Sequence, residues 1–179
     1  MSARQIFKGR NRAERDVEHL LQSIVAAELV APSDVLWLVS PWISDVPVLD
    51  NRAGAFSGLE PTWSSRPVTL VEVLVALLAR GTRVVVATRT DEHNRRFVHR
   101  LTSGAQAAGL AARLLVRQDE RERLHEKGLL GDDYYLAGSM NFTERGIRLN
   151  DEAVSYQLGE EAVARARLHF RQTYGAPPP

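Results

Sequence analysis

Hydrophobic positions along the chain repeat with two periods, and their alternation predicts an α/β fold. Spacings of three and four residues, which are typical of helices, run through 11–30, 69–80, 91–108 and 160–174. Short apolar runs, which are typical of buried strands, occupy 35–39, 83–87, 112–116, 124–130, 134–137 and 153–157. A chain with this alternation is expected to form a mixed, largely buried β-sheet flanked by helices on both faces.

Residues that stop or cap helices support these boundaries. Pro32 follows the first helix, Gly81 follows the second, and Asp91 is suited to cap the third. A turn at 131–133 is expected to join two strands as a hairpin.

The segment 44–67 departs from this periodic pattern. It holds three prolines and few regularly spaced apolar residues, so we expect a long loop rather than a helix or strand. The loop leaves the carboxyl end of a strand, where α/β proteins tend to bind ligands. It is therefore a candidate roof for a site.

Composition limits the class of protein. A chain of 179 residues, 44% hydrophobic and 25% charged, fits one globular domain over 1–179. A formal net charge of +1 excludes a strongly basic protein that coats nucleic acid, but permits local basic patches. The absence of cysteine excludes disulfides, thiolate catalysis and cysteine-bound zinc. Without a leader pattern or a membrane-spanning apolar run, we expect a cytoplasmic protein that does not enter the membrane.

The two ends of the chain differ from its middle. Residues 1–11 form an expected basic arm that contains Arg4, Lys8 and Arg10, and Arg12 and Arg15 follow it directly. The arm is either a solvated tail or a contact for phosphate groups. Residues 175–179 are expected to form a loose tail.

The chain has only two lysines, and one of them stands beside a histidine. Lys127 lies two residues after His125, on an expected strand. Alternate strand residues point to the same face, so the imidazole and the ammonium should converge while Glu126 points away. The pattern predicts a nucleophile and a cation in one pocket.

A second polar cluster lies downstream. Ser139 and Asn141 could share a face as hydroxyl and amide donors for an anion, and Gly138 permits a close approach of backbone to a ligand. Glu152 begins the next expected strand, where a carboxylate could hold a histidine Nδ1 proton and present Nε2 for attack.

Together these residues form a spaced motif, His125-x-Lys127-xxxx-Asp132, followed by Gly138-Ser139-x-Asn141 and Asn150-x-Glu152. This motif resembles the HxKxxxxD signature of the phospholipase D superfamily. Ser40-Pro41-Trp42-Ile43 after the first strand also resembles that family's layout. The resemblance covers about 35–154 and implies a phospholipase D-like fold with one half-site in each chain.

The resemblance also implies a role for each residue. His125 is the expected nucleophile and forms a phosphohistidine, while Lys127, Ser139 and Asn141 bind phosphate oxygens. Asp132 has a supporting, mainly structural role, and Glu152 orients a histidine, either of the same chain or of the partner copy. Further candidates for contact with the substrate are Ser40 and Trp42. The implied chemistry needs no metal and no cofactor.

Only one His-x-Lys pair exists, because no lysine follows two residues after His19, His93, His99 or His169. In-line displacement needs both a nucleophile and a general acid, so we expect a homodimer in which each copy supplies one His125. Short members of the family with a single motif are mostly nucleases, which makes DNA or RNA the expected partner. Two alternatives remain open. One is a non-catalytic or conditionally active subunit of a bacterial defence or DNA-modification complex, with protein partners. The other is a phospholipase, which the polar 44–67 loop does not favour.

Other polar and aromatic residues have more ordinary explanations. Trp37 is expected in the core, whereas Trp42 and Trp63 suit either core packing or stacking on a base. Arg95, Arg96 and Arg100 are expected to form a solvated helix face rather than a nucleic-acid contact.

Overall fold

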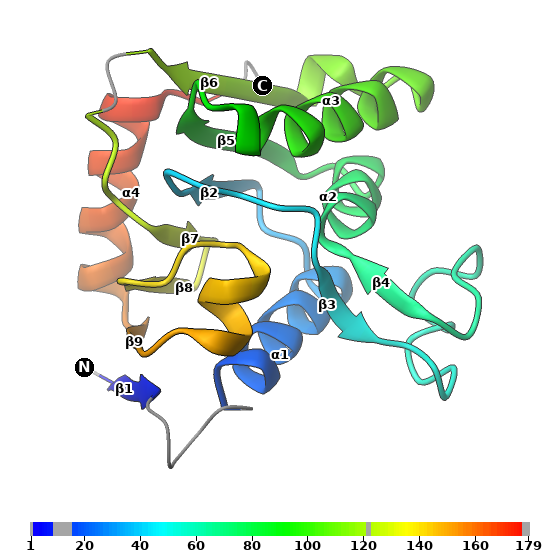
Figure 1. Ribbon diagram of the computed structural model, residues 1–179, viewed down its shortest axis with the longest axis horizontal. Coiled ribbons are helices and arrows are strands. Elements are labelled where there is room, and N and C mark those ends of the chain that lie inside the picture. Colours follow the sequence, from blue (N-terminus) through cyan, green and yellow to red (C-terminus); the bar gives the residue numbers. More distant parts are fainter. Residues whose placement is uncertain (1, 9–15, 121–122, 177–179) are drawn as a thin grey trace.

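The computed structural model describes residues 2–8, 16–120 and 123–176, and its central feature is a seven-stranded mixed sheet (Figure 1). The strands lie in the order β1-β9-β8-β7-β2-β5-β6. Their bounds are β1 Ser2–Lys8, β2 Val35–Val39, β5 Arg83–Arg89, β6 Leu114–Asp119, β7 Gly128–Leu130, β8 Tyr134–Gly138 and β9 Glu152–Leu158.

The sheet changes from parallel to antiparallel pairing at its middle. β2, β5 and β6 are parallel, whereas β7 pairs antiparallel with β2 and places Gly128 opposite Val39. β8, β9 and β1 continue the antiparallel pairing. As a result, β2, β5 and β8 finish at the same end of the sheet at which β7 and β9 begin. We call this the carboxyl end of the sheet.

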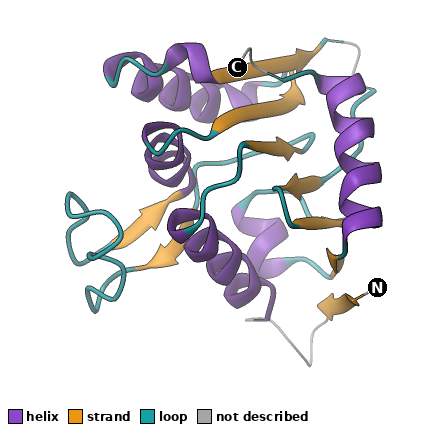
Figure 2. Ribbon diagram, turned by 180° about the vertical axis from the view of Figure 1, so that it is seen from behind, coloured by secondary structure: helices purple, strands orange, loops and turns teal. Residues whose placement is uncertain are grey.

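Helices cover both faces of the sheet, which confirms the expected fold class (Figure 2). One face packs against α1 (Asp16–Val30), α2 (Leu70–Ala79) and α3 (Glu92–Ala107), and the other packs against α4 (Glu160–Tyr174). Alternate side chains of β2 divide between the two cores, because successive strand residues point to opposite faces. Leu38 joins the three-helix side, while Trp37 joins the α4 side and donates its indole N–H to Gly175 O at 2.9 Å. The expected core position of Trp37 is thus confirmed.

The hydrophobic pattern located the helices well but started two strands too early. The expected strand 112–116 begins only at Leu114, after the short 3₁₀ helix Ala111–Arg113, and continues to Asp119. α2, α3 and α4 match their expected ranges within a residue or two, and Asp91 caps α3 by accepting a hydrogen bond from His93 N. The expected strand 124–130 is wrong over its first half, because β7 begins only at Gly128. Side chains hold the backbone there instead of a strand partner: Leu124 N donates to Asp119 Oδ2, and Leu124 O accepts from Arg89 Nε.

The segment 44–67 is more ordered than a loop and lies elsewhere than expected. β3 (Pro47–Asp50) and β4 (Pro67–Thr69) pair as a small antiparallel sheet. The residues between them fold around buried Asn51, which accepts from Phe56 N and donates to Ser64 O. They project to the side opposite 123–127 (Figures 1 and 2), so within one chain this segment does not roof His125. Trp63 is buried in the core, only 6% exposed.

Part of each chain end is structured. Residues 2–8 of the expected basic arm form β1, which pairs with β9, and Arg4 is exposed. Arg10, Arg12 and Arg15 lie outside the described residues. In the expected tail, the carbonyl of Gly175 receives the Trp37 hydrogen bond and Ala176 packs against the α4 core, while 177–179 lie outside the described residues.

The close approach of β8 to β9 predicts a sharp steric effect at Gly138. A Cβ added there would lie 2.1 Å from Ala153 O, so the strands would have to separate. We expect Gly138→Ala to lower the free energy of unfolding by about 1–3 kcal/mol, measured by urea denaturation. Gly58→Ala is the control, because an added Cβ meets nothing within 4 Å there. Equal stability of the two variants would contradict the observed packing.

Candidate active site

His125 and Lys127 lie in the extended segment that leads into β7, at the carboxyl end of the sheet. His125 is exposed and Lys127 is half-buried. Between them, Glu126 points to α4, where its Oε2 accepts from Tyr174 at 2.7 Å and lies 3.0 Å from His169 Nε2. The expected alternation of side chains is therefore present even though the segment is not part of the strand. Lys127 Nζ donates to His125 O at 2.5 Å.

Arg89, which the sequence analysis did not single out, lies directly beside His125. It ends β5, is 8% exposed, and places Nη2 at 3.0 Å from His125 Nε2. Its guanidinium also lies 5.0 Å from the ring centroid of Trp42. The position of Arg89 in the sequence could have identified it. An arginine that directly follows an apolar strand in an α/β fold lies at the end of the sheet where ligands bind.

These surroundings lower the pKa of the Lys127 ammonium. Burial lowers the pKa of Lys127, the nearby positive charge of Arg89 lowers it further, and the negative charge of Glu152 acts in the opposite direction. Two cations and one carboxylate thus interact at this end of the sheet. The local arrangement favours an anionic ligand.

Ser139 and Glu152 form a direct pair on the adjacent strands. Ser139 Oγ donates to Glu152 Oε2 and accepts from Ala153 N at 3.0 Å, and Glu152 is only 9% exposed. Asn150 Nδ2 lies 3.5 Å from Glu152 Oε1. Within the described residues Glu152 contacts this serine and no histidine, so the expected orienting role stays a prediction. Any contact of Glu152 with a histidine requires another molecule or a rearrangement.

Ser40, Trp42 and Asn141 meet where β2 ends. Ser40 Oγ lies 2.9 Å from Trp42 O and 3.1 Å from Asn141 Oδ1. Since the amide oxygen of Asn141 faces Ser40, its amide nitrogen points to the other side as a donor. Trp42 is half-buried between two partners: its N–H donates to Asp91 Oδ2 at 3.3 Å, and its ring faces Arg89. This placement suits a contact within the site better than a place in the core.

Asn94 is a second residue that sequence reasoning missed. It is fully buried on α3, where its Nδ2 donates to Pro41 O at 2.8 Å and to Arg89 O at 2.9 Å. Its Oδ1 accepts from Ile43 N at 2.8 Å. The signal was an asparagine in register with the buried residues Phe97 and Leu101 of α3. Asn94 fixes the chain after β2 and the end of β5 in one position.

Asp132 and Gly138 contact other parts of the protein rather than the candidate site. Asp132 lies in the β7–β8 turn, at the opposite end of the sheet from His125, where its Oδ2 accepts from Asp34 N at 2.7 Å and its carbonyl accepts from Arg167. The structure therefore does not bring Asp132 to the other candidates. At Gly138 it is the β9 carbonyl of Ala153, rather than a ligand, that occupies the space a side chain would fill.

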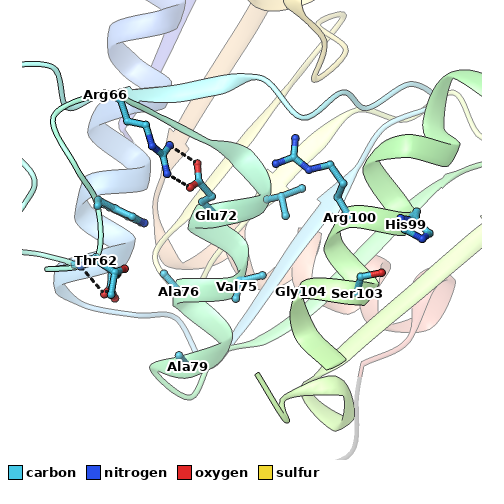
Figure 3. A pocket seen from close by; sticks show the side chains of 13 residues that line it. Thr62, Arg66, Glu72, Val75, Ala76, Ala79, His99, Arg100, Ser103 and Gly104 are labelled. Atoms are coloured by element: carbon cyan, nitrogen blue, oxygen red, sulfur yellow. Dashed lines mark hydrogen bonds and ion pairs between the residues drawn. The ribbon is translucent and has the colours of Figure 1, made fainter. Parts of the chain in front are cut away.

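A hollow of about 600 Å³ lies elsewhere, between α2, α3 and the 51–66 segment (Figure 3). Both arginines that line it are paired with carboxylates: Arg66 with Glu72, and Arg100 with Asp45, each at 2.5 Å. Along α3, Arg95 and Arg96 are exposed, so the basic residues of this helix lie at the surface, as the solvated-face interpretation expected. No candidate catalytic residue lines this hollow.

In the described part of the chain, no group of three or more histidine, cysteine, aspartate or glutamate side chains is placed to hold a metal ion. None of the helices in these parts of the chain combines the length and apolar character needed to cross a membrane.

The fold and the arrangement at the carboxyl end of the sheet define a protein with a His-x-Lys pair beside an arginine on a mixed α/β sheet. A family model described as "Cardiolipin synthase, PLD-like domain" matches residues 60–174, which is more than half of the chain. The chain belongs to this phospholipase D-like domain family. A search of curated protein sequences finds no significant match.

Solved structures show the same fold at low sequence identity. Nuc, a phospholipase D family member from Salmonella typhimurium, superposes with a TM-score of 0.62 and 14% identity, over 97% of this chain and 93% of Nuc. NucT from Helicobacter pylori gives 0.59 and 12%, over 96% and 95%. The archaeal chromatin protein TrmBL2 gives 0.56 and 11%, over 97% of this chain and 52% of TrmBL2.

The contacts of Asp132 predict a loss of stability when its carboxylate is removed. Asp132→Ala leaves Asp34 N without its acceptor, so we expect the free energy of unfolding to fall by about 1–3 kcal/mol in urea denaturation. The neighbouring Asp133 is exposed, so Asp133→Ala should change stability by less than about 0.5 kcal/mol. An Asp132 variant as stable as the control would show that the turn does not depend on this carboxylate.

Proposed function

We propose that the protein is a metal-independent phosphodiesterase that cleaves nucleic acid through a phosphohistidine on His125. The observation that carries this proposal is the exposed imidazole of His125, which contacts Arg89 while the His125 carbonyl accepts from Lys127, at the end of the sheet where Ser139 and Asn141 also lie. The imidazole supplies a nucleophile, and the cations and polar donors suit the charge of a phosphodiester.

Nucleic acid is the substrate class that the surroundings favour. Arg117 on β6 and Arg123 just before His125 are exposed, so further basic side chains beside the site are accessible to a phosphate backbone. TrmBL2, which has the same fold, is described by its solvers as binding DNA. These two observations support a polyanionic substrate over a single lipid headgroup.

One chain supplies one nucleophile, so the proposal includes a homodimer. The leaving oxygen needs an acid on the side opposite the attacking imidazole, and the partner's His125 is suited to that role. Apolar side chains flank the site: Leu149 is 70% exposed three residues before Glu152, and Phe7 is 70% exposed opposite Ala153 in the β1–β9 ladder. A second copy that covers these side chains would remove them from water.

The activity is tested directly with purified protein in EDTA. Single-stranded DNA, double-stranded DNA, RNA and bis(p-nitrophenyl) phosphate are the substrates, and phosphatidylcholine vesicles test for a phospholipase. We expect cleavage of nucleic acid, and a loss of at least about 10³-fold in kcat/KM for His125→Ala. His99→Ala is the matched control, because His99 is an exposed histidine on α3 beside the distant hollow.

Cleavage that disappears with EDTA but survives His125→Ala would contradict the mechanism. Binding of DNA without cleavage would instead favour the non-catalytic subunit.

The shared site is tested by mixing subunits. Wild-type protein and His125→Ala protein are unfolded together and refolded in different ratios, so that the copies pair at random. If each site needs both histidines, mixed dimers are inactive and total activity falls as the square of the wild-type fraction. Mixtures with Arg165→Gln, an exposed change on α4, should keep full activity at every ratio. A linear fall with His125→Ala would mean that each chain acts alone.

A further inference from the structure

Arg89 is a nearly buried cation whose partners leave its charge uncompensated. Its Nε donates to Leu124 O at 2.9 Å, and its Nη2 lies 3.0 Å from His125 Nε2. Within the described residues, none of the ion pairs includes Arg89. Buried charges in proteins are normally paired, so this guanidinium is expected to receive an anion from outside the chain.

The direction of the Arg89–His125 hydrogen bond follows from chemistry alone. A guanidinium stays protonated and has five N–H donors but no acceptor. Nη2 must therefore donate, and His125 Nε2 must accept with a lone pair. The Nε2 nitrogen carries no hydrogen in this arrangement, and the proton of the neutral ring lies on Nδ1. The lone pair needed for attack on phosphorus is thus present on Nε2, but it is engaged in the hydrogen bond from Arg89.

Two further contacts hold the arginine in place. The Trp42 ring, 5.0 Å away, faces the guanidinium, and Asn94 fixes the backbone carbonyl of Arg89. The guanidinium can therefore change its hydrogen-bond partner without leaving its position. The positive charges of Arg89 and Lys127 repel each other, as the lowered pKa of Lys127 indicates. An anion placed between the two groups would relieve this repulsion.

We propose that Arg89 covers the His125 nucleophile in the free protein and transfers its hydrogen bond to a non-bridging oxygen of the scissile phosphate, which releases Nε2 for attack. This inference rests on the proposed function and adds a catalytic residue to it. Reacting atoms approach to about 3–3.5 Å, so an oxygen bonded to the attacked phosphorus comes within reach of Nη2. The planar fork of the guanidinium suits a phosphate.

The chemical step balances without a further reactant. The Nε2 lone pair forms the N–P bond as the bond from phosphorus to the leaving oxygen breaks. In the partner subunit the same hydrogen bond must also be released, so that the partner's His125 takes up a proton from solvent at Nε2. The leaving oxygen takes this proton from the partner subunit's His125. Water then attacks the phosphohistidine and gives one proton to the partner subunit's His125, while the N–P bond breaks and restores Nε2 of the nucleophile. Arg89 stays charged throughout and stabilises the oxygens on phosphorus, after which the product leaves and its hydrogen bond returns to Nε2.

Inorganic phosphate is a probe that tests this exchange without turnover. In full-length protein with ¹⁵N-labelled histidine, we expect the Nε2 resonance of His125 to report a nitrogen without hydrogen that accepts a hydrogen bond. Added phosphate should shift this resonance. Arg89→Met should shift it before any phosphate is added, and should weaken phosphate binding by about 10–100-fold.

Two further variants complete the experiment. Arg113→Met is the matched control, because Arg113 also donates to a backbone carbonyl, that of Leu78, but lies outside the site. It should leave both the resonance and the phosphate affinity unchanged. Arg89→Lys keeps the charge without the fork, so its phosphate affinity should lie between wild type and Arg89→Met. It also carries the test if the methionine variant does not fold.

The outcomes separate this inference from the proposed function. Wild-type resonance and phosphate affinity in both Arg89 variants would overturn the role of Arg89, even if nucleic acid is cleaved. Absence of cleavage with the phosphate-dependent shift intact would instead overturn the proposed function, and Arg89 would remain an anion-binding residue. For an active enzyme, we expect Arg89→Met to lower kcat/KM by at least about 100-fold, with a loss in kcat as well as an increase in KM.

Discussion

The antiparallel pairing of β7 with β2 is the contact on which the candidate site depends. Because Gly128 pairs with Val39, the residues just before β7 arrive where β2 ends. His125 and Lys127 therefore lie at the end of the sheet where Ser40 follows β2 and where Arg89 ends the parallel neighbour β5. The hairpin to β8 and the return along β9 then bring Ser139 and Glu152 to the same end of the sheet. A fully parallel sheet would place the His-x-Lys segment at its opposite end.

At this end of the sheet the loops are held by hydrogen bonds from side chains, because their backbones no longer pair as strands. Asn94 binds three backbone groups from within the core, and Ser40 links the end of β2 to Asn141. A single backbone bridge between Ile43 and Phe142 joins the same two loops. Buried polar groups that are fully bonded in this way hold one geometry, since each alternative leaves a donor or acceptor unsatisfied. The candidate catalytic groups thus project from a rigid base.

The distribution of charge separates this surface from its surroundings. Glu126, between the two motif residues, turns to His169 and Tyr174 on α4, which keeps its carboxylate away from Lys127. Glu152 is engaged by Ser139, while Arg89 and Lys127 retain positive charge close to His125. This asymmetry supports the proposal that one chain supplies half of a phosphodiester site.

What the sequence determined by itself is mostly local. The periodicity of 69–80 and 160–174 located two helices, and the spacing of His125 and Lys127 placed both side chains away from Glu126, because these properties depend on neighbours within a few residues. Contacts between distant segments were decided only by the tertiary structure. They include Arg89 against His125, Asn94 beneath the end of β2, Ser139 rather than a histidine on Glu152, and Asp132 at the far end of the sheet. Each joins residues whose distance is set by strand order, and strand order is a property of the packed sheet rather than of any one segment.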